Sequence, residues 1–236
     1  LQTLFPYTTL FRSRWEFFMF LDKLKGQLSD HQGLFIGEDT AFRSAVLIPL
    51  VQVEEEWHIL FEVRALKMRK QPGDISFRGG RIDETDESPL SAALRETSEE
   101  LKIDENQVQV IGQLSPYVAS PSFVIYPFVG TIEGDQFLEN YNKDEVQELF
   151  TVPVKWLLNH EPYLHLVTMT PEPSPDFPFD KIMNGTEYQW RSRSIEEWFF
   201  EYEKYTIWGL TARILKHFIA ILKQGDFLDL ADSACS

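Results

Sequence analysis

One stretch of this chain, residues 79–103, constrains the fold more than any other. It opens with Gly79 and Gly80, a predicted turn that supplies a positive φ or lets the backbone approach a ligand closely. Ser88 and Pro89 then offer an N-cap and a first helical residue, where the missing N–H of proline is harmless. The stretch therefore predicts a glycine turn that leads into a short helix.

The predicted helix carries three carboxylates on one face. Glu96, Glu99 and Glu100 are neighbours at the i, i+3 and i+4 spacing. Crowded carboxylates repel one another unless a cation lies among them, and such hard oxygen ligands suit Mg²⁺ or Mn²⁺. A solvated acidic face is the alternative that the spacing alone leaves open. The opposite face is predicted to enter the core: Leu90, Leu94, Thr97 and Leu101.

The order of these residues resembles the Nudix box, in which Gly, Glu, Arg-Glu and Glu-Glu follow at set spacings. The matching residues are Gly80, Asp86, Arg95, Glu96, Glu99 and Glu100. The helix begins one residue late, and Asp86 stands where Glu is usual. Lys102 replaces the final glycine, and Thr97 takes an apolar position.

Residues upstream extend the resemblance to the coenzyme A pyrophosphatase branch of the Nudix family. They are Leu60, Phe61, Glu62, Val63, Arg64, Ala65, Arg69, Gly73, Phe77, Gly79, Gly80 and Asp86. That branch also has the longer box, so the offset supports the match. It has proline where this chain has Arg78, which is predicted to loosen the turn and to add charge beside a phosphate site. The resemblance implies an α/β Nudix fold, with a mixed β-sheet sandwiched between α-helices.

Composition limits the number of domains, the partners and the cellular setting that this chain can have. The chain has 236 residues, 43% of them hydrophobic, which is enough for the core of one domain. A formal net charge of −15 argues against nucleic acid and anionic lipid as partners. The one cysteine, Cys235, excludes a disulfide framework, and no apolar run approaches the roughly 18 residues of a membrane span. We expect a cytoplasmic protein; whether it forms a homodimer is left open.

The first 13 residues look foreign to the rest of the chain. Residues 3–13 resemble the in-frame translation of a DNA-sequencing adapter, and no Met precedes them. We expect residues 1–13 to be a non-native leader, the natural start to lie between Arg14 and Met19, and residues 14–236 to form a single Nudix hydrolase domain. A targeting leader is the alternative, but the segment lacks a basic stretch followed by an apolar run.

Apolar periodicity and turn residues predict the other elements. Strands are expected at residues 45–53, 58–63, 108–114, 123–132, 163–169 and 188–205, helices at 17–27, 156–158 and 206–221, and a proline-rich loop at 170–181. The last helix presents an apolar stripe of Leu210, Ile214, Phe218 and Ile221. Phe123, Tyr126 and Phe128 could stack on an adenine ring, although aromatic residues of a strand more often enter the core.

A cluster of positive charge precedes the acidic helix. Six of the 22 basic residues fall within residues 64–81: Arg64, Lys67, Arg69, Lys70, Arg78 and Arg81. A solvated loop is one interpretation; a cationic rim that holds substrate phosphates is the other. The resemblance favours contacts from Arg64 and Arg69, together with the backbone around Gly79 and Gly80 and with Arg81.

The resemblance implies metal-dependent hydrolysis of a nucleoside diphosphate linked to another group. For the coenzyme A branch the substrate is coenzyme A or acyl-CoA, cut into 3′,5′-ADP and (acyl)phosphopantetheine. The predicted ligands of Mg²⁺ or Mn²⁺ are Glu96, Glu99, Glu100 and Asp86. Glu99 or Glu100 could instead act as the base, Arg95 is expected to orient a carboxylate, and Glu145 is a further candidate ligand or base. ADP-ribose or NADH as substrate, and a catalytically weak sensing module, remain alternatives.

Overall fold

The computed structural model describes residues 14–29, 35–38, 40–134 and 138–225, and the chain divides into two compact units, Leu1–Thr40 and Ala41–Ser236. The first unit contains helix α1 (Arg14–Ser29), so the helix predicted at residues 17–27 is confirmed. Its Phe18, Met19 and Phe20 are about half exposed. The predicted leader, residues 1–13, lies outside the described residues.

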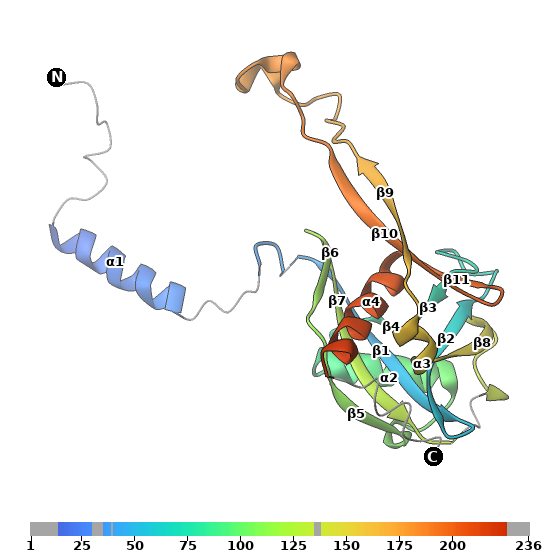
Figure 1. The fold of residues 1–236 in the computed structure, drawn as a ribbon. Helices are drawn as coiled ribbons and strands as arrows, with labels where there is room; N and C mark the ends of the chain where they lie inside the picture. Colours follow the sequence, from blue (N-terminus) through green and yellow to red (C-terminus); the bar gives the residue numbers. More distant parts are fainter. Residues whose placement is uncertain (1–13, 30–34, 39, 135–137, 226–236) are drawn as a thin grey trace. The chain divides into compact units, whose positions relative to one another are not determined.

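The second unit is built on a mixed β-sheet (Figure 1). The strands of its main path run in the order β3-β2-β1-β7-β5, with β4 on β1, β6 on β7 and β8 on β2. The β1–β7 pair is parallel and the other pairs are antiparallel. The bounds are β1 (Phe42–Val53), β2 (Glu56–Arg64), β3 (Ile75–Ser76), β4 (Arg78–Arg81), β5 (Val108–Gln113), β6 (Tyr117–Ser120), β7 (Phe123–Ile132) and β8 (Val146–Pro153).

Helices cover both faces of this sheet. Successive side chains of β1 point to opposite faces, and those on each face pack against a different helix. On one side, Val46 and Ile48 pack with helix α4 (Gly209–Gln224). On the other side, Ala45 pairs with Gly80, where an added Cβ would meet Glu96 of helix α2 (Pro89–Leu101). The predicted sheet between helices is confirmed.

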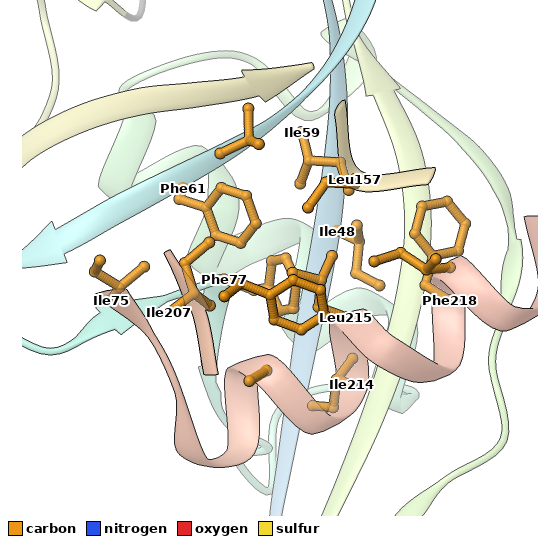
Figure 2. Close-up of a cluster of buried hydrophobic side chains, with 14 of the residues drawn as sticks. Ile48, Ile59, Phe61, Ile75, Phe77, Leu157, Ile207, Ile214, Leu215 and Phe218 are labelled. Carbon is orange, nitrogen blue, oxygen red and sulfur yellow. The ribbon is translucent and has the colours of Figure 1, made fainter. Parts of the chain in front are cut away.

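The core on the α4 side is rich in aromatic rings (Figure 2). Phe61 stacks between Phe77 and Phe150, with ring centroids 5.2 and 5.4 Å away. Phe150 in turn stacks on Tyr205 at 3.6 Å. Each ring buries a large apolar surface, and the offset contacts add to the stability of the packing. This cluster ties β2 to β8 and to the segment that leads into α4.

A second sheet has the order β11-β10-β9, formed by β9 (Tyr163–Met169), β10 (Arg193–Tyr202) and β11 (Tyr205–Ile207). Every side chain of β9 is exposed, and β9 and β10 extend as a ribbon from the sheet (Figure 1). Residues 170–181 form the predicted loop, ending in a short 3-10 helix (Phe179–Lys181). Two further 3-10 helices are Glu105–Gln107 and Gly185–Glu187.

Several predicted elements differ from the structure. Strands β3, β4, β6 and β8 were not predicted, and the strand predicted at residues 188–205 is confined to β10 and the start of β11. The last helix begins at Gly209 rather than residue 206, because Thr206 and Ile207 pair with β10. Ile221 is 40% exposed and so does not join the apolar stripe. The predicted helix at residues 156–158 is confirmed as α3 (Val154–Asn159).

Candidate active site

The two glycines lie in a strand, so the predicted turn is wrong. Gly79 and Gly80 belong to β4 and pair with Val46 and Ala45 of β1. Gly79 has φ +147°, and a Cβ there would lie 2.1 Å from the carbonyl oxygen of Ala45. A Cβ on Gly80 would lie 2.5 Å from Cδ of Glu96. Gly79 therefore lets β4 approach β1, and Gly80 lets the Glu96 carboxylate rest on β4.

Helix α2 has the predicted N-terminus and an unusual C-terminus. Ser88 accepts a hydrogen bond from the Ser91 backbone N–H at 3.1 Å, and Pro89 is the first helical residue. At the other end, Lys102 adopts the left-handed conformation, with φ 52° and ψ 46°, and its N–H bonds to the Ser98 carbonyl. This is the position at which the Nudix box has glycine. Lys102 thus closes the helix as glycine would, at a cost in backbone strain.

The predicted core face of α2 is confirmed in part, because Thr97 and Leu101 are fully buried. Leu90 and Leu94 are only partly buried, whereas Glu100 is buried. The buried residues are Ala92, Ala93, Thr97, Glu100 and Leu101. The small alanines let the helix lie close to the sheet, which turns Glu100 inward. The three glutamates differ in exposure: the Glu99 side chain is 63% exposed, Glu96 is half-buried and Glu100 is buried.

Arg95 pairs with carboxylates, as predicted. Its Nε donates to Oδ1 of Asp86 at 3.0 Å, and its Nη2 donates to Oδ2 at 3.0 Å. Its Nη1 donates to Oε1 of Glu96 at 2.9 Å. The hydrogen bonds from Arg95 lower the pKa of Asp86, and those same bonds raise the pKa of Arg95. Both oxygens of Asp86 are therefore engaged by Arg95, and its place in a metal shell stays a prediction.

Arg78 does not lie on the basic rim, so the predicted charge beside a phosphate site is wrong. Its side chain is fully buried and forms an ion pair with buried Glu62. Ser76 also donates to Oε1 of Glu62 at 2.7 Å, and Nη1 of Arg78 lies 3.6 Å from Oε2 of Glu100. Arg78 therefore joins β4 to β2 and α2. The sequence analysis named Glu62 only as part of the extended signature and gave it no role; the signal was an acid among apolar residues in a predicted strand.

Burial raises the pKa of the most buried glutamate of α2. Desolvation raises the pKa of Glu100 to about 7, against the opposing effect of the Arg78 charge. Desolvation likewise raises the pKa of Glu96. The charge of Glu145 raises the pKa of both groups, which places this predicted residue near the helix glutamates. Burial also lowers the pKa of Arg78 to about 10.

Arg64 is the rim residue that the structure places beside the carboxylates. Its Nη1 lies 3.9 Å from Oε1 of Glu62, and its charge lowers the pKa of Glu100. The next residue, Ala65, donates its backbone N–H to the Glu145 carbonyl at 2.8 Å, which holds the loop against the Glu145 segment. Arg69 is exposed, and Arg81 is exposed with its guanidinium 5.8 Å from the ring centre of Phe42. Lys67 pairs with exposed Asp144.

A cleft lies next to Arg64 on the α4 side of the sheet. Its volume is about 300 Å³, and most of its lining comes from residues 64–79 and 208–214, with further residues from β1, β7 and β10. Phe77 and Leu210 contribute apolar walls, and Trp208 lies at the N-terminus of α4. Nε of Arg64 is buried there without a hydrogen-bond partner. Tyr126 and Phe128 are buried in the core, as the more common role of strand aromatics predicts.

The carboxylates fit a divalent cation by their chemistry. Oε2 of Glu100 is buried and has no hydrogen-bond partner, and Glu96 and Glu99 supply further hard oxygen donors. Within the described ranges, no three acidic, histidine or cysteine side chains are already arranged to hold a metal ion. The residues that would hold one are Glu96, Glu99 and Glu100.

The chain belongs to the NUDIX domain family, whose model matches residues 41–170. It is 34% identical over 174 residues to the protein named "Uncharacterized Nudix hydrolase NudL" of Enterobacter sp. (strain 638), covering 74% of this chain and 79% of that protein. The NudL protein of Escherichia coli (strain K12) is 32% identical over the same shares. A solved MutT/nudix family protein from Enterococcus faecalis matches 90% of this chain and 76% of that chain, with a TM-score of 0.45 and 14% identity.

The family model and the NudL relatives confirm the predicted family, and the mixed sheet between helices agrees with the predicted fold class. The chain is a Nudix hydrolase, an enzyme that cleaves pyrophosphate bonds of small nucleotide substrates, and such enzymes generally use divalent cations. In the described part of the chain, no helix has the length and apolar character of a membrane-spanning segment.

Proposed function

We propose that this enzyme hydrolyses the pyrophosphate bond of coenzyme A or an acyl-CoA, which gives 3′,5′-ADP and (acyl)phosphopantetheine. The observation that carries the proposal is the position of Arg64. Arg64 lies beside Glu62, which belongs to the same buried group of charges as Glu100, and it also lines the cleft. A phosphate bound at Arg64 would lie between the hydrolytic groups and a pocket for an organic group.

The cleft supports coenzyme A as the substrate class. A volume of about 300 Å³ is at the lower end for small-molecule sites. Its walls combine apolar side chains with polar ones, and Asp74 and Glu197 add two carboxylates that disfavour a second anionic group. Such a lining suits an uncharged chain with a few amides, as in pantetheine, better than a second charged nucleotide. Arg69 of the loop and Arg81 at the end of β4 are exposed and available to the additional 3′-phosphate of coenzyme A.

The carboxylates of α2 supply the hydrolytic groups in this proposal. A divalent cation, when bound, neutralises pyrophosphate charge and lowers the pKa of a bound water. Glu96, Glu99 and Glu100 would hold it, with Glu145 near enough to add a further carboxylate. Glu99 is the most exposed of the three and can take a proton from an attacking water; Glu100 is the alternative base. Arg95 orients Glu96 through their hydrogen bond at 2.9 Å.

ADP-ribose or NADH is the second substrate class, because carboxylates that hold a cation at the pyrophosphate would not distinguish the groups attached to it. A weak sensing module is the third candidate. Two observations oppose it: Lys102 closes α2 in the conformation that the usual glycine would adopt, and Arg78 is paired inside the protein. The cytoplasmic setting stays a prediction, and a homodimer stays open.

The deciding experiment compares coenzyme A, ADP-ribose and NADH as substrates, with Mg²⁺ or Mn²⁺ and with a chelator, and separates the products by chromatography. Both the full chain and a chain that begins at Met19 are assayed. Metal-dependent release of 3′,5′-ADP from coenzyme A is the expected result. A preference for ADP-ribose or NADH would overturn the role given to the cleft and Arg64 and keep the hydrolytic chemistry. Binding without turnover would favour the sensing module.

A further inference from the structure

Three charged side chains from three elements meet inside the protein. Glu62 comes from β2, Arg78 from β4 and Glu100 from α2. Arg78 is 0% exposed, Glu62 is 2% exposed and Glu100 is 5% exposed. Water screens such charges little, so each one acts strongly on its neighbours. The charge of residue 78 therefore bears directly on Glu100.

The guanidinium of Arg78 is shared unequally between the two carboxylates. It forms an ion pair with Glu62, whereas its Nη1 lies 3.6 Å from Oε2 of Glu100, too far for a strong hydrogen bond. Oε2 of Glu100 has no hydrogen-bond partner, and neither do Nε and Nη2 of Arg78. The charge of Arg78 therefore offsets the charge of Glu100, while Oε2 of Glu100 remains available to a ligand.

We propose that Arg78 is an internal counter-cation of Glu100, which weakens divalent-cation binding at the α2 carboxylates relative to a chain with an uncharged residue 78. The proposal rests on the proposed function, in which Glu100 is one of the groups that hold the cation. When both carboxylates are ionised, the buried cluster of Glu62, Arg78 and Glu100 carries a single net negative charge. A metal ion that binds Glu100 must approach a fixed positive charge, and that repulsion raises its dissociation constant.

The alternative is a purely structural pair, in which Arg78 and Glu62 only hold β4 to β2. A structural pair would affect stability and leave the affinity for metal unchanged. The two roles therefore differ in a quantity that can be measured without substrate, which is the dissociation constant for Mn²⁺.

The test measures Mn²⁺ binding by isothermal titration calorimetry, in the unaltered chain and in Arg78→Met and Arg78→Lys variants. Arg78→Met removes the charge and keeps most of the volume, so its dissociation constant for Mn²⁺ is expected to fall by about tenfold or more. Arg78→Lys is the matched control, because it retains the charge; its constant is expected to stay within about threefold of the unaltered value. Equal constants in all three proteins would overturn the proposal.

Loss of one partner from a buried pair also destabilises the protein. In chelator, Arg78→Met is expected to lower the melting temperature by roughly 6–20 °C, with a larger recovery on adding Mn²⁺ than the unaltered chain shows. The double variant Glu62→Gln with Arg78→Met removes both charges of the pair and protects the test against failure to fold. Because it also removes the negative charge of Glu62, the double variant is expected to bind Mn²⁺ less tightly than Arg78→Met, whereas equal or tighter binding would refute the account of the affinity by buried charge.

Failure of the proposed function has a different outcome. If the unaltered chain binds Mn²⁺ but cleaves neither coenzyme A nor the other nucleotides, the proposed function fails, and the comparison of dissociation constants still decides the role of Arg78. If the Met variants alone bind Mn²⁺, the counter-cation role is supported in its strongest form. If no variant binds Mn²⁺, the inference is wrong.

Discussion

The guanidinium of Arg95 holds the carboxylate of Asp86 by two hydrogen bonds, Nε to Oδ1 and Nη2 to Oδ2, each 3.0 Å long. Such a paired geometry fixes the plane of the guanidinium as well as its position. The remaining donor, Nη1, then points to Glu96 at 2.9 Å. Asp86, which lies before α2, thereby sets the orientation of a carboxylate within the helix.

Replacing Arg95 with lysine should lower turnover by roughly 10- to 100-fold, since lysine keeps the charge but cannot bond both Asp86 oxygens and Glu96 at once. Steady-state kinetics with saturating Mg²⁺ measures the effect. Arg191→Lys, at an exposed position of the loop before β10, is the control and should leave turnover unchanged. Equal turnover in both variants would show that Arg95 has no orienting role.

Glu99→Gln should abolish measurable turnover and change the melting temperature by no more than about 2 °C, because an exposed surface charge contributes little to stability. The expected loss follows from its proposed place as a metal ligand or base. Glu87→Gln, an exposed glutamate just before the helix, is the matched control and should remain active. An active but strongly destabilised Glu99→Gln protein would contradict the proposed site.

The sequence predicted the helices, most strands and the glutamate face, because these depend on local periodicity and on caps. It did not predict the buried position of Arg78, because that depends on Glu62, which is sixteen residues away in the chain and lies in another strand. Likewise, the buried face of α2 depends on how closely Ala92 and Ala93 approach the sheet. Long-range pairing and close packing decide what spacing within one segment cannot.

Lys102→Gly should stabilise the protein by about 1 kcal/mol, because Lys102 has φ 52°, a conformation that glycine adopts without steric cost. Urea unfolding, with an unchanged m-value, measures the gain. Lys102→Ala is the control: it removes the charge but keeps Cβ, so no comparable gain is expected. If alanine stabilises as much as glycine, the side-chain charge and not backbone strain is responsible.

Gly79→Ala and Gly80→Ala should fail in different ways. A Cβ on Gly79 would meet the Ala45 carbonyl at 2.1 Å in a conformation with φ +147°, so we expect a loss of about 3 kcal/mol or more in the free energy of unfolding.

A Cβ on Gly80 would instead displace the end of the flexible Glu96 side chain, 2.5 Å away. We expect Gly80→Ala to cost less than about 1 kcal/mol in stability and to lower turnover by roughly tenfold or more, since a small misplacement of a catalytic group is costly. Gly112→Ala, with no atom within 4 Å of its Cβ, is the control for both. Thermal unfolding and turnover are measured on each variant. A Gly80→Ala enzyme with full turnover would show that the Glu96 carboxylate need not rest on β4.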